Sequence, residues 1–193
     1  DPEQVITTGR ALTRAAERLG DLANDLLDLA RIESGEHTFD IELVTVSDCV
    51  EKVFDLLAPS AQSEDITLTQ SGQTDLQTRT DPQALGRILI NLVENAIKNG
   101  ASVVDVHIKT SIKEDLQITV TDNGPGIPKH LHERVFERFF RTGGNRSPNY
   151  QGTGLGLAIV KHLVAGLGGA IVLSSAPAGG AIFTITLPHS SDA

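Results

Sequence analysis

The 193-residue sequence has no methionine, no tryptophan and a single cysteine, Cys49. No apolar run in it approaches the roughly 20 residues that are needed to cross a bilayer. One thiol excludes a disulfide framework and any zinc or iron–sulfur site built on several cysteines. Because its neighbour Val50 is apolar, Cys49 is predicted to be a small buried residue.

Basic residues are scarce as well. The chain has 16 Lys and Arg against 25 Asp and Glu, a formal net charge of −9. This balance argues against nucleic acid as the main partner, because neutralising phosphates requires a basic surface. The remaining composition, 39% hydrophobic and 21% charged, is that of a folded domain. Since translation starts at Met, a chain that begins at Asp1 and has no Met is expected to be a piece of a longer protein.

Residues 3–34 are expected to form one long helix. Its a/d spacing is typical of a coiled coil or a helical bundle. An amphipathic helix packed on its own domain is the alternative. We favour a seam with a second copy, since a seam this long without a partner would expose its leucines. Two apolar rows with a seven-residue repeat, offset by three, define the seam: Val5, Leu12, Leu19 and Leu26, and Ala15, Leu22 and Leu29.

After residue 35 the pattern changes to short strands and helices. The short connections within 66–80 and 103–121 predict two hairpins. We therefore predict an α+β fold, a two-layer α/β sandwich: a mixed, mostly antiparallel sheet is covered on one face by three helices and preceded by one long helix. Strand-like runs occupy 40–44, 66–70, 76–80, 103–109, 115–121, 170–174 and 181–187, and helical periodicity occupies 47–63, 82–99 and 153–166.

A polar stripe runs along the helix expected at 82–99. Asn91, Asn95 and Lys98 lie at i, i+4 and i+7, opposite the apolar face. Asn is a poor helix former. Its neutral amide oxygen, however, suits a hydrated Mg²⁺, and a lysine adds charge for the phosphates that the metal carries. By itself, the stripe is more typical of a solvated helix face.

Two glycine-rich segments follow. Residues 122–128 (DNGPGIP) come directly after a strand, where the Asp122 carboxylate can accept a hydrogen bond from an exocyclic amine such as that of adenine. An ordinary turn has the same composition. Residues 152–157 (GTGLGL) open a helix, where free N–H groups and the helix dipole make an anion site. This segment is neither a Walker A loop nor a convincing dinucleotide fingerprint.

Between these segments lie a box rich in Phe and Arg and then a polar stretch. Residues 135–141 (VFERFFR) hold three of the six Phe, with Arg138 and Arg141 among them. The Phe side chains are core anchors in the simplest interpretation, and the arginines are candidates to clamp a γ-phosphate. Residues 141–151 are rich in Gly, Asn and Pro, which is typical of a lid that closes over a nucleotide.

The order of these elements is more specific than any one of them. Asn-x-x-x-Asn, DxGxG, the Phe/Arg box, a lid and GxGLGL resemble the N, G1, F and G2 boxes of the ATP-binding domain of sensor histidine kinases. The run LLDLARIESG at 26–35 resembles the end of the second helix of that family's dimerisation and phosphotransfer hairpin. Phe183 and the pair Leu187-Pro188 match its closing strand. The resemblance implies that residues 1–36 are that helix, truncated from its hairpin, and that residues 37–193 are the ATP-binding catalytic domain.

The resemblance implies a site for ATP and Mg²⁺. Asn95, assisted by Asn91, would bind the metal, and Asp122 would read the adenine amino group. Glu94 would orient a water or the acceptor, unless it only forms a surface ion pair. The residues implied to act in catalysis are Asn91, Glu94, Asn95, Lys98, Arg138 and Arg141. Those implied to bind the nucleotide are Asn91, Asn95, Lys98, Asp122, Gly124, Gly126, Ile127, Phe139, Arg141, Gly152, Thr153, Gly154, Leu155, Gly156 and Leu157.

The implied reaction is in-line transfer of the γ-phosphoryl group of ATP to a His nitrogen, and then to an Asp of a response regulator. No His-Glu/Asp-Leu-Arg-like string surrounds any of the six His. The acceptor is therefore expected upstream of Asp1, and this chain is expected to bind nucleotide without phosphorylating itself. The family also implies a homodimer through the 3–34 helix. The catalytic part is expected to be cytoplasmic, in a parent that is either soluble or anchored in the inner membrane.

Two other classes stay open. The first is a catalytically idle module that binds nucleotide, dimerises and regulates a partner by its conformation. The second is a serine kinase of the anti-sigma type, which the long helix at 3–34 disfavours. Asn91 stands where the related gyrase, Hsp90 and MutL ATPases carry a Glu that activates water. An amide cannot act as that base, so the residue favours transfer over hydrolysis.

Overall fold

The computed structural model describes residues 2–35, 37–111, 114–142, 153–177 and 179–188. The expected strands and helices are all present, with small shifts at their ends. In chain order the elements are α1 (Pro2–Glu33), β1 (Glu42–Thr45), α2 (Val46–Ser63), β2 (Thr67–Gly72), β3 (Gln77–Thr80), α3 (Pro82–Lys98), β4 (Val103–Thr110), β5 (Leu116–Asp122), the 3₁₀ turns η1 (Lys129–Leu131) and η2 (Arg134–Phe136), α4 (Gly156–Gly166), β6 (Ala170–Ser175) and β7 (Ala181–Leu187).

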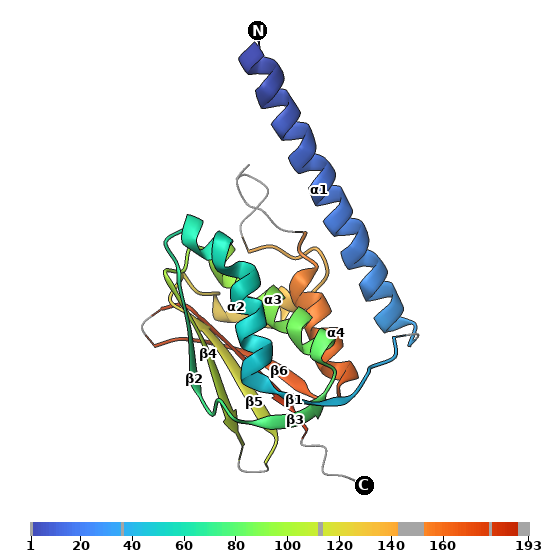
Figure 1. Cartoon of the computed structure of the whole chain (residues 1–193), viewed down its shortest axis with the longest axis vertical. Helices are drawn as coiled ribbons and strands as arrows, with labels where there is room; N and C mark the ends of the chain where they lie inside the picture. The colour runs from blue at the N-terminus through green and yellow to red at the C-terminus, as the bar shows by residue number, and fades with distance from the viewer. Residues whose placement is uncertain (1, 36, 112–113, 143–152, 178, 189–193) are drawn as a thin grey trace.

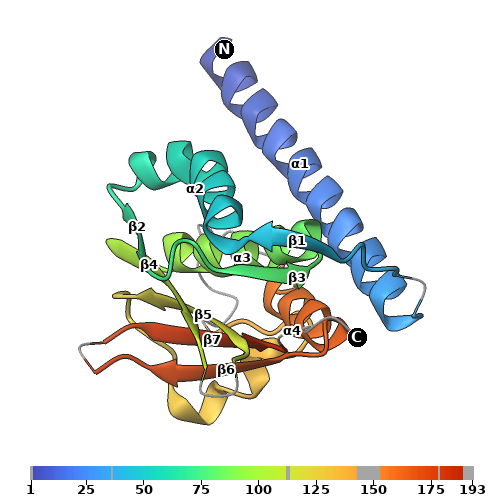
Figure 2. The same ribbon diagram turned by 60° about the horizontal axis from the view of Figure 1, so that its bottom comes forward.

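A five-stranded sheet forms one layer, and α2, α3 and α4 cover one of its faces (Figures 1 and 2). Its strand order is β2-β4-β5-β7-β6. β2 and β4 are parallel, and the other three pairs are antiparallel. In β5 and β7 every second side chain is buried, because alternate residues of a strand point to the covered face. The predicted two-layer α+β sandwich, preceded by one long helix, is confirmed.

One of the two predicted hairpins is wrong. β4 and β5 pair antiparallel through a short connection, as predicted for 103–121. The two runs in 66–80 do not pair with each other. β2 lies parallel to β4, whereas β3 pairs with β1 in a separate two-stranded antiparallel sheet. The connection from β2 to β4 passes through β3 and α3, in keeping with the crossover that parallel neighbours require.

Asp81 determines where α3 starts. Its Oδ1 accepts hydrogen bonds from the N–H groups of Gln83 and Ala84 at 2.8 and 2.9 Å, and Pro82 takes the first helical position. Its Oδ2 accepts from the N–H of Asp40 at 3.0 Å, which ties the segment before β1 to the same helix end. One face of α3 is buried in the core, and this leaves the opposite face for polar side chains. The buried face consists of Ala84, Leu85, Ile88, Leu89, Leu92, Val93, Ala96 and Ile97.

Helix α1 extends beyond the sandwich, and its C-terminal part packs against α4 (Figure 1). Leu29 is buried and Leu22 packs against the core, whereas Leu19 and Leu26 are 67% and 41% exposed. The two apolar rows therefore separate: one packs within the chain and the other faces outward. The alternative prediction, a helix that packs on its own domain, is therefore confirmed for one of the two rows. Three predicted seam side chains lie outside the described part of the structure: Val5, Leu12 and Ala15.

In the part of the chain that the structure describes, no helix is long and apolar enough to cross a membrane. Cys49 lies in α2 and is buried, as predicted. Burial raises the pKa of its thiol above the ordinary value of 9.0. Because the thiolate is the reactive form, Cys49 is a packing residue and not a nucleophile.

Candidate functional site

A cavity of about 790 Å³ opens between α3, α4, the end of β5 and the C-terminal half of α1. Its volume lies in the range of ligand pockets, roughly 300–1,000 Å³. Gly124, Arg138 and Leu155 are not part of its lining, and Gly152 lies outside the described residues. The predicted site residues that line it are Asn91, Glu94, Asn95, Lys98, Asp122, Gly126, Ile127, Phe139, Arg141, Thr153, Gly154, Gly156 and Leu157.

Asp122, the last residue of β5, forms one end of the cavity and is only 9% exposed. Its Oδ1 accepts from the N–H of Gly124 at 2.9 Å and from the N–H of Ala181 at 3.2 Å. Both donors reach the same oxygen, which leaves Oδ2 as the acceptor for a ligand. The carboxylate is therefore held in one orientation by the backbone of two segments, and the site can bind an N–H group there.

Two glycines allow backbone segments to approach each other closely at this end of the cavity. Gly126 has a φ of +72°, and a Cβ there would lie 2.9 Å from the backbone oxygen of Gly180. Gly180 has a φ of +100°, and a Cβ there would lie 1.9 Å from the backbone oxygen of Asp122. Only glycine fits both the conformation and the space. The wall beside Asp122 is thus backbone, which a flat ligand can approach closely.

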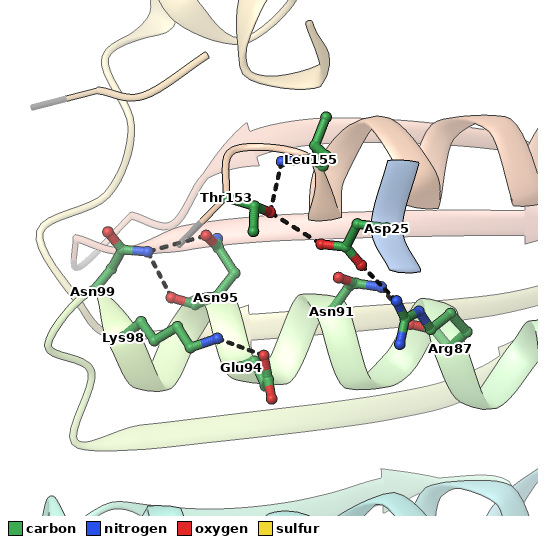
Figure 3. A network of polar contacts seen from close by, with 9 residues as sticks. All are labelled: Asp25, Arg87, Asn91, Glu94, Asn95, Lys98, Asn99, Thr153 and Leu155. Carbon is green, nitrogen blue, oxygen red and sulfur yellow. Dashed lines mark hydrogen bonds and ion pairs between the residues drawn. The ribbon is translucent and has the colours of Figure 1, made fainter. Parts of the chain in front are cut away.

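The polar stripe of α3 forms the facing side of the cavity, and Figure 3 shows Asn91 and Asn95 pointing toward the loop that carries Thr153. Nδ2 of Asn91 donates to the backbone oxygen of Arg87 at 2.8 Å. A Cβ on Gly156 would lie 2.5 Å from Oδ1 of Asn91, so α4 starts beside this oxygen only because residue 156 has no side chain.

Lys98, on the same stripe, forms an ion pair with Glu94 one turn away. Nζ of Lys98 lies 2.5 Å from Oε2 of Glu94, and both side chains are about 40% exposed (42% and 38%). Such an exposed pair contributes little to stability, about 0–1 kcal/mol. Little free energy is therefore lost when Lys98 leaves Glu94, so the lysine can bind a more highly charged anion instead.

The N-terminus of α4 closes the cavity from the other side. Gly154 has a φ of +73° in the turn that precedes it, and its oxygen accepts from the N–H of Phe139 at 2.9 Å. Oγ1 of Thr153 accepts from the N–H of Leu155 at 3.2 Å. The helix itself starts at Gly156, and the sequence-based start at 153 was too early because 153–155 form this turn. Free N–H groups at a helix start favour anions, so the arrangement can bind phosphate.

The Phe side chains of the 135–141 box lie in two kinds of environment. Phe136 packs edge-on against Phe183 of β7, with ring centroids 6.3 Å apart, and Arg134 lies 4.7 Å from the ring centroid of Phe140. Phe136 and Phe140 are partly buried and pack against the core, which confirms the interpretation of these two Phe residues as anchors. Phe139 differs, since it is 56% exposed and lines the cavity.

The two arginines of the box differ in position. Arg141 lines the cavity, whereas the guanidinium of Arg138 pairs with Glu33 of α1. Nε2 of His162 lies 3.2 Å from the same Glu33 carboxylate. Burial, and then the charges of Arg138 and Lys161, lower the pKa of His162 below its ordinary 6.5. His162 is therefore neutral at pH 7, and Glu33 has Arg138 as its charged partner.

Helix α1 reaches the cavity through Asp25, whose side chain is only 13% exposed. Its Oδ1 lies 2.6 Å from a guanidinium nitrogen of Arg87, and its Oδ2 accepts from Oγ1 of Thr153 at 3.0 Å (Figure 3). One carboxylate thus joins α1 to α3 and to the turn before α4. Sequence reasoning missed this role, because the heptad pattern draws attention to the apolar positions of α1.

Arg87 and Asn99 also line the cavity and were not among the predicted site residues. Both belong to one line that runs along α3 and onto its C-cap residue Asn99. In this line Arg87, Asn91, Asn95 and Asn99 recur every four residues. This spacing is a signal that was available in the sequence. Asn99 was not predicted as a site residue because it ends the helix, where Asn is a common residue.

The described residues contain no group of three or more His, Cys, Asp or Glu side chains that could hold a metal ion. The polar stripe of α3 offers the amide oxygens of Asn91 and Asn95, which are neutral, beside the carboxylate of Glu94. Such oxygens suit Mg²⁺ only when a ligand supplies the charge, as nucleotide phosphates do. The amide oxygens of Asn91 and Asn95 therefore fit Mg²⁺ that arrives with phosphates.

Comparison with known proteins agrees with this geometry. Residues 80–191 match the family described as histidine kinase-, DNA gyrase B-, and HSP90-like ATPase, which is more than half of the chain. The chain belongs to this ATPase family. Membership confirms the resemblance to the ATP-binding domain of sensor histidine kinases.

Several relatives within the ATPase family are sensor kinases. Sensor-like histidine kinase SenX3 of Mycolicibacterium smegmatis is 36% identical over 193 residues, which is 100% of this chain and 50% of that protein. Sensor protein KdpD of Escherichia coli is 38% identical over 169 residues, which is 87% of this chain and 18% of KdpD. The chain thus spans half the length of SenX3 and a smaller part of KdpD.

Solved structures show the same fold. Full-length ShkA in complex with AMPPNP superimposes with a TM-score of 0.83 at 29% identity, covering 95% of this chain and 38% of ShkA. Mycobacterial sensor histidine kinase MprB gives a TM-score of 0.67 at 30% identity, covering 78% of this chain and 98% of the MprB chain. The likeness to ShkA therefore includes most of α1 as well as the sandwich.

Proposed function

We propose that the chain is the ATP-binding catalytic part of a sensor histidine kinase, which positions Mg-ATP for transfer of its γ-phosphoryl group to a His on an upstream helix. The phosphoryl group would then pass to an Asp of a response regulator. One observation carries the proposal: the α3 stripe and the N-terminus of α4 face each other across one cavity, and Asp122 lies at its end. The acceptor at Asp122 would fit the adenine of ATP, the amides of α3 would fit its Mg²⁺, and the N-terminus of α4 would fit its phosphates.

At the base end, Asp122 would accept a hydrogen bond from the adenine amino group. The support is its fixed orientation, since two backbone N–H groups hold Oδ1 and leave Oδ2 for the ligand. Gly126 and Ile127 would form the wall against the base. A charged acceptor for an N–H donor contributes about 1.5–3 kcal/mol.

At the phosphate end, Asn95 and Asn91 would hold Mg²⁺, which when bound neutralises phosphate charge. Lys98 would leave Glu94 for a phosphate, and the N–H groups at the start of α4, from Gly156 and Leu157, would bind further phosphate oxygens. Thr153, Gly154 and Arg141 would complete this end, together with Gly152. Arg138 would approach the γ-phosphate only after its guanidinium leaves Glu33.

In the transfer itself, the bond between the γ-phosphorus and its bridging oxygen breaks, a bond from phosphorus to an imidazole nitrogen forms, and ADP leaves. The residues of this chain would act by holding the phosphates in line. Hydrolysis is disfavoured because Asn91 stands where the related ATPases carry a Glu that activates water, and an amide cannot act as that base.

We assign residues 1–36 to the second helix of the dimerisation and phosphotransfer hairpin and residues 37–193 to the ATP-binding domain. The outward row of α1, with Leu19 and Leu26, would face the second copy in a homodimer, while Leu22 and Leu29 pack on the domain. A response regulator would bind the assembled dimer near the acceptor His.

The proposal is tested by calorimetric titration of the chain with ATP, with Mg²⁺ and with EDTA. We expect one site, tighter binding with Mg²⁺, and loss of that Mg²⁺ effect in Asn95→Ala. The matched control is Gln62→Ala, an exposed amide in α2 that does not line the cavity, which should bind as the unchanged chain does. Absence of ATP binding at millimolar concentration, or an unchanged Mg²⁺ effect in Asn95→Ala, would overturn the proposal.

A further inference from the structure

Three asparagines follow one another at four-residue intervals along the cavity side of α3. Asn91, Asn95 and Asn99 all line the cavity, but their amides have different contacts. The amide of Asn91 turns back along the helix, since its Nδ2 donates to the backbone oxygen of Arg87. The amide of Asn99 contacts the next side chain of the line: its Nδ2 donates to Oδ1 of Asn95 at 3.0 Å (Figure 3).

The same nitrogen of Asn99 makes a second bond, to the backbone oxygen of Asn95 at 2.6 Å. A side-chain amide nitrogen carries two N–H donors, so both bonds form together. The bond to the backbone anchors the Asn99 side chain on the last turn of α3. From this fixed position its other N–H acts on the amide of Asn95.

Orientation matters at Asn95 because the two ends of its amide differ in chemistry. Oδ1 can bind a cation, whereas Nδ2 is a donor only and repels one. A half-turn about the last side-chain bond exchanges the two ends with little change in shape. With Asn99 in place, that half-turn would set N–H donors against each other. Oδ1 therefore stays toward Asn99, and its second lone pair remains for a metal.

We propose that Asn99 is a positioning residue for metal binding: it holds Oδ1 of Asn95 in the orientation that binds Mg²⁺. This inference rests on the proposed function, in which Asn95 is a ligand of the metal. Because the described residues offer no cluster of His, Cys, Asp or Glu for a metal, the placement of a neutral amide oxygen has a large effect. Outer-shell partners of this kind typically change metal affinity by about 10- to 100-fold.

A purely structural role for Asn99 has a different signature. Its backbone N–H bonds to carbonyls of the last turn, so Asn99 also ends α3. If it only stabilised this helix end, its loss would lower the melting temperature and weaken ATP binding equally with Mg²⁺ and with EDTA. A positioning role instead raises the Mg²⁺ concentration that is needed and leaves binding in EDTA unchanged.

The experiment is a set of ATP titrations at increasing Mg²⁺ and in EDTA, on the unchanged chain and four variants: Asn95→Ala, Asn99→Ala, the double variant, and Asn99→Leu, which keeps the shape of Asn without its donor. Gln62→Ala again serves as the matched amide control. We expect Asn99→Ala and Asn99→Leu to raise the Mg²⁺ midpoint by about 10- to 100-fold. The double variant should have the same midpoint as Asn95→Ala, because Asn99 acts only through Asn95.

The outcomes separate the two proposals. If Asn95→Ala leaves the Mg²⁺ midpoint unchanged, the metal site of the proposed function is wrong and this inference fails with it. If Asn95→Ala raises the midpoint but Asn99→Ala and Asn99→Leu do not, only the role of Asn99 is refuted. Equal weakening in EDTA and in Mg²⁺, or additive effects in the double variant, would also overturn it, since Asn99 would then act on the nucleotide or the fold directly.

Discussion

Asp25→Asn is the substitution that most directly tests how α1 is held against the ATP-binding domain. Asp25 bridges Arg87 of α3 and Thr153 of the turn before α4. Asn keeps the shape of the side chain but has one oxygen and no charge. It can therefore accept from one of these partners and not from both.

The expected magnitude follows from burial and charge. Two unit charges about 4 Å apart attract by about 4 kcal/mol at an effective dielectric constant of 20, before the cost of desolvation is subtracted. Hydrogen bonds to charged groups contribute about 1.5–3 kcal/mol net. Asp25 is 13% exposed but Arg87 is 39% exposed, so solvent screening places the value at the lower end. We expect a loss of about 1–2 kcal/mol, a factor of roughly 5–30 in the docking equilibrium of α1.

The assay is amide hydrogen exchange, because undocked helix amides exchange faster. In Asp25→Asn, the amides of residues 22–33 should exchange roughly 5–30 times faster, while buried amides of α3 keep their rates. Asp28→Asn is the matched control: its carboxylate lies 3.7 Å from the same arginine and is 46% exposed, so its effect should be smaller. Equal acceleration in both variants, or none in Asp25→Asn, would show that Asp25 does not hold α1 against the domain.

Other single features of the structure can be tested in the same way. Asp122→Asn should weaken ATP binding by about 10- to 100-fold in calorimetry. The two backbone N–H groups would hold the oxygen of the new amide, so its NH₂ group would face the adenine amine. Unchanged affinity would contradict the assigned role of Asp122. The free energy of unfolding should fall as the pH drops below 6.5, because the pKa of His162 is lowered in the folded chain and the unfolded chain therefore binds the proton first. Urea titrations should show a shallower fall of this free energy in His162→Gln. Equal slopes in the two proteins would speak against the prediction. Gly154→Ala should destabilise the chain by about 1–2 kcal/mol, because residue 154 has a φ of +73° and its Cβ would lie 2.9 Å from the backbone of Phe139. Gly86→Ala, with open space around it inside α3, should instead stabilise by up to about 1 kcal/mol, and thermal melts in which both changes have the same sign would be inconsistent with this.

The elements with strong local signals could be predicted from the sequence. In α3, the periodicity of the apolar face and the pair Asp81-Pro82 determine the helix and its start, and both depend on neighbouring residues only. The order of the boxes identified the family for a similar reason, since each box lies within a few residues. Strand pairing was predicted only where the connection is short, as between β4 and β5.

Features that depend on distant contacts could not be predicted. Alternation in 66–80 indicates strands but not that β2 pairs with β4 across α3. A heptad pattern shows two apolar rows, yet it does not show that Leu22 and Leu29 pack on the domain while Leu19 and Leu26 stay exposed. The same limit applies to polar groups at the site, because the bridge made by Asp25 joins residues that lie far apart in the chain.

Phosphoryl transfer from labelled ATP is the decisive test of the proposed kinase function. The protein extended upstream of Asp1, so that it includes the proposed acceptor helix, should form a phosphohistidine that is acid-labile and stable to base. Asn95→Ala in the same protein should abolish it, and the present chain alone should bind ATP without becoming labelled. A labelled His in the present chain, or full labelling in Asn95→Ala, would contradict the proposed function.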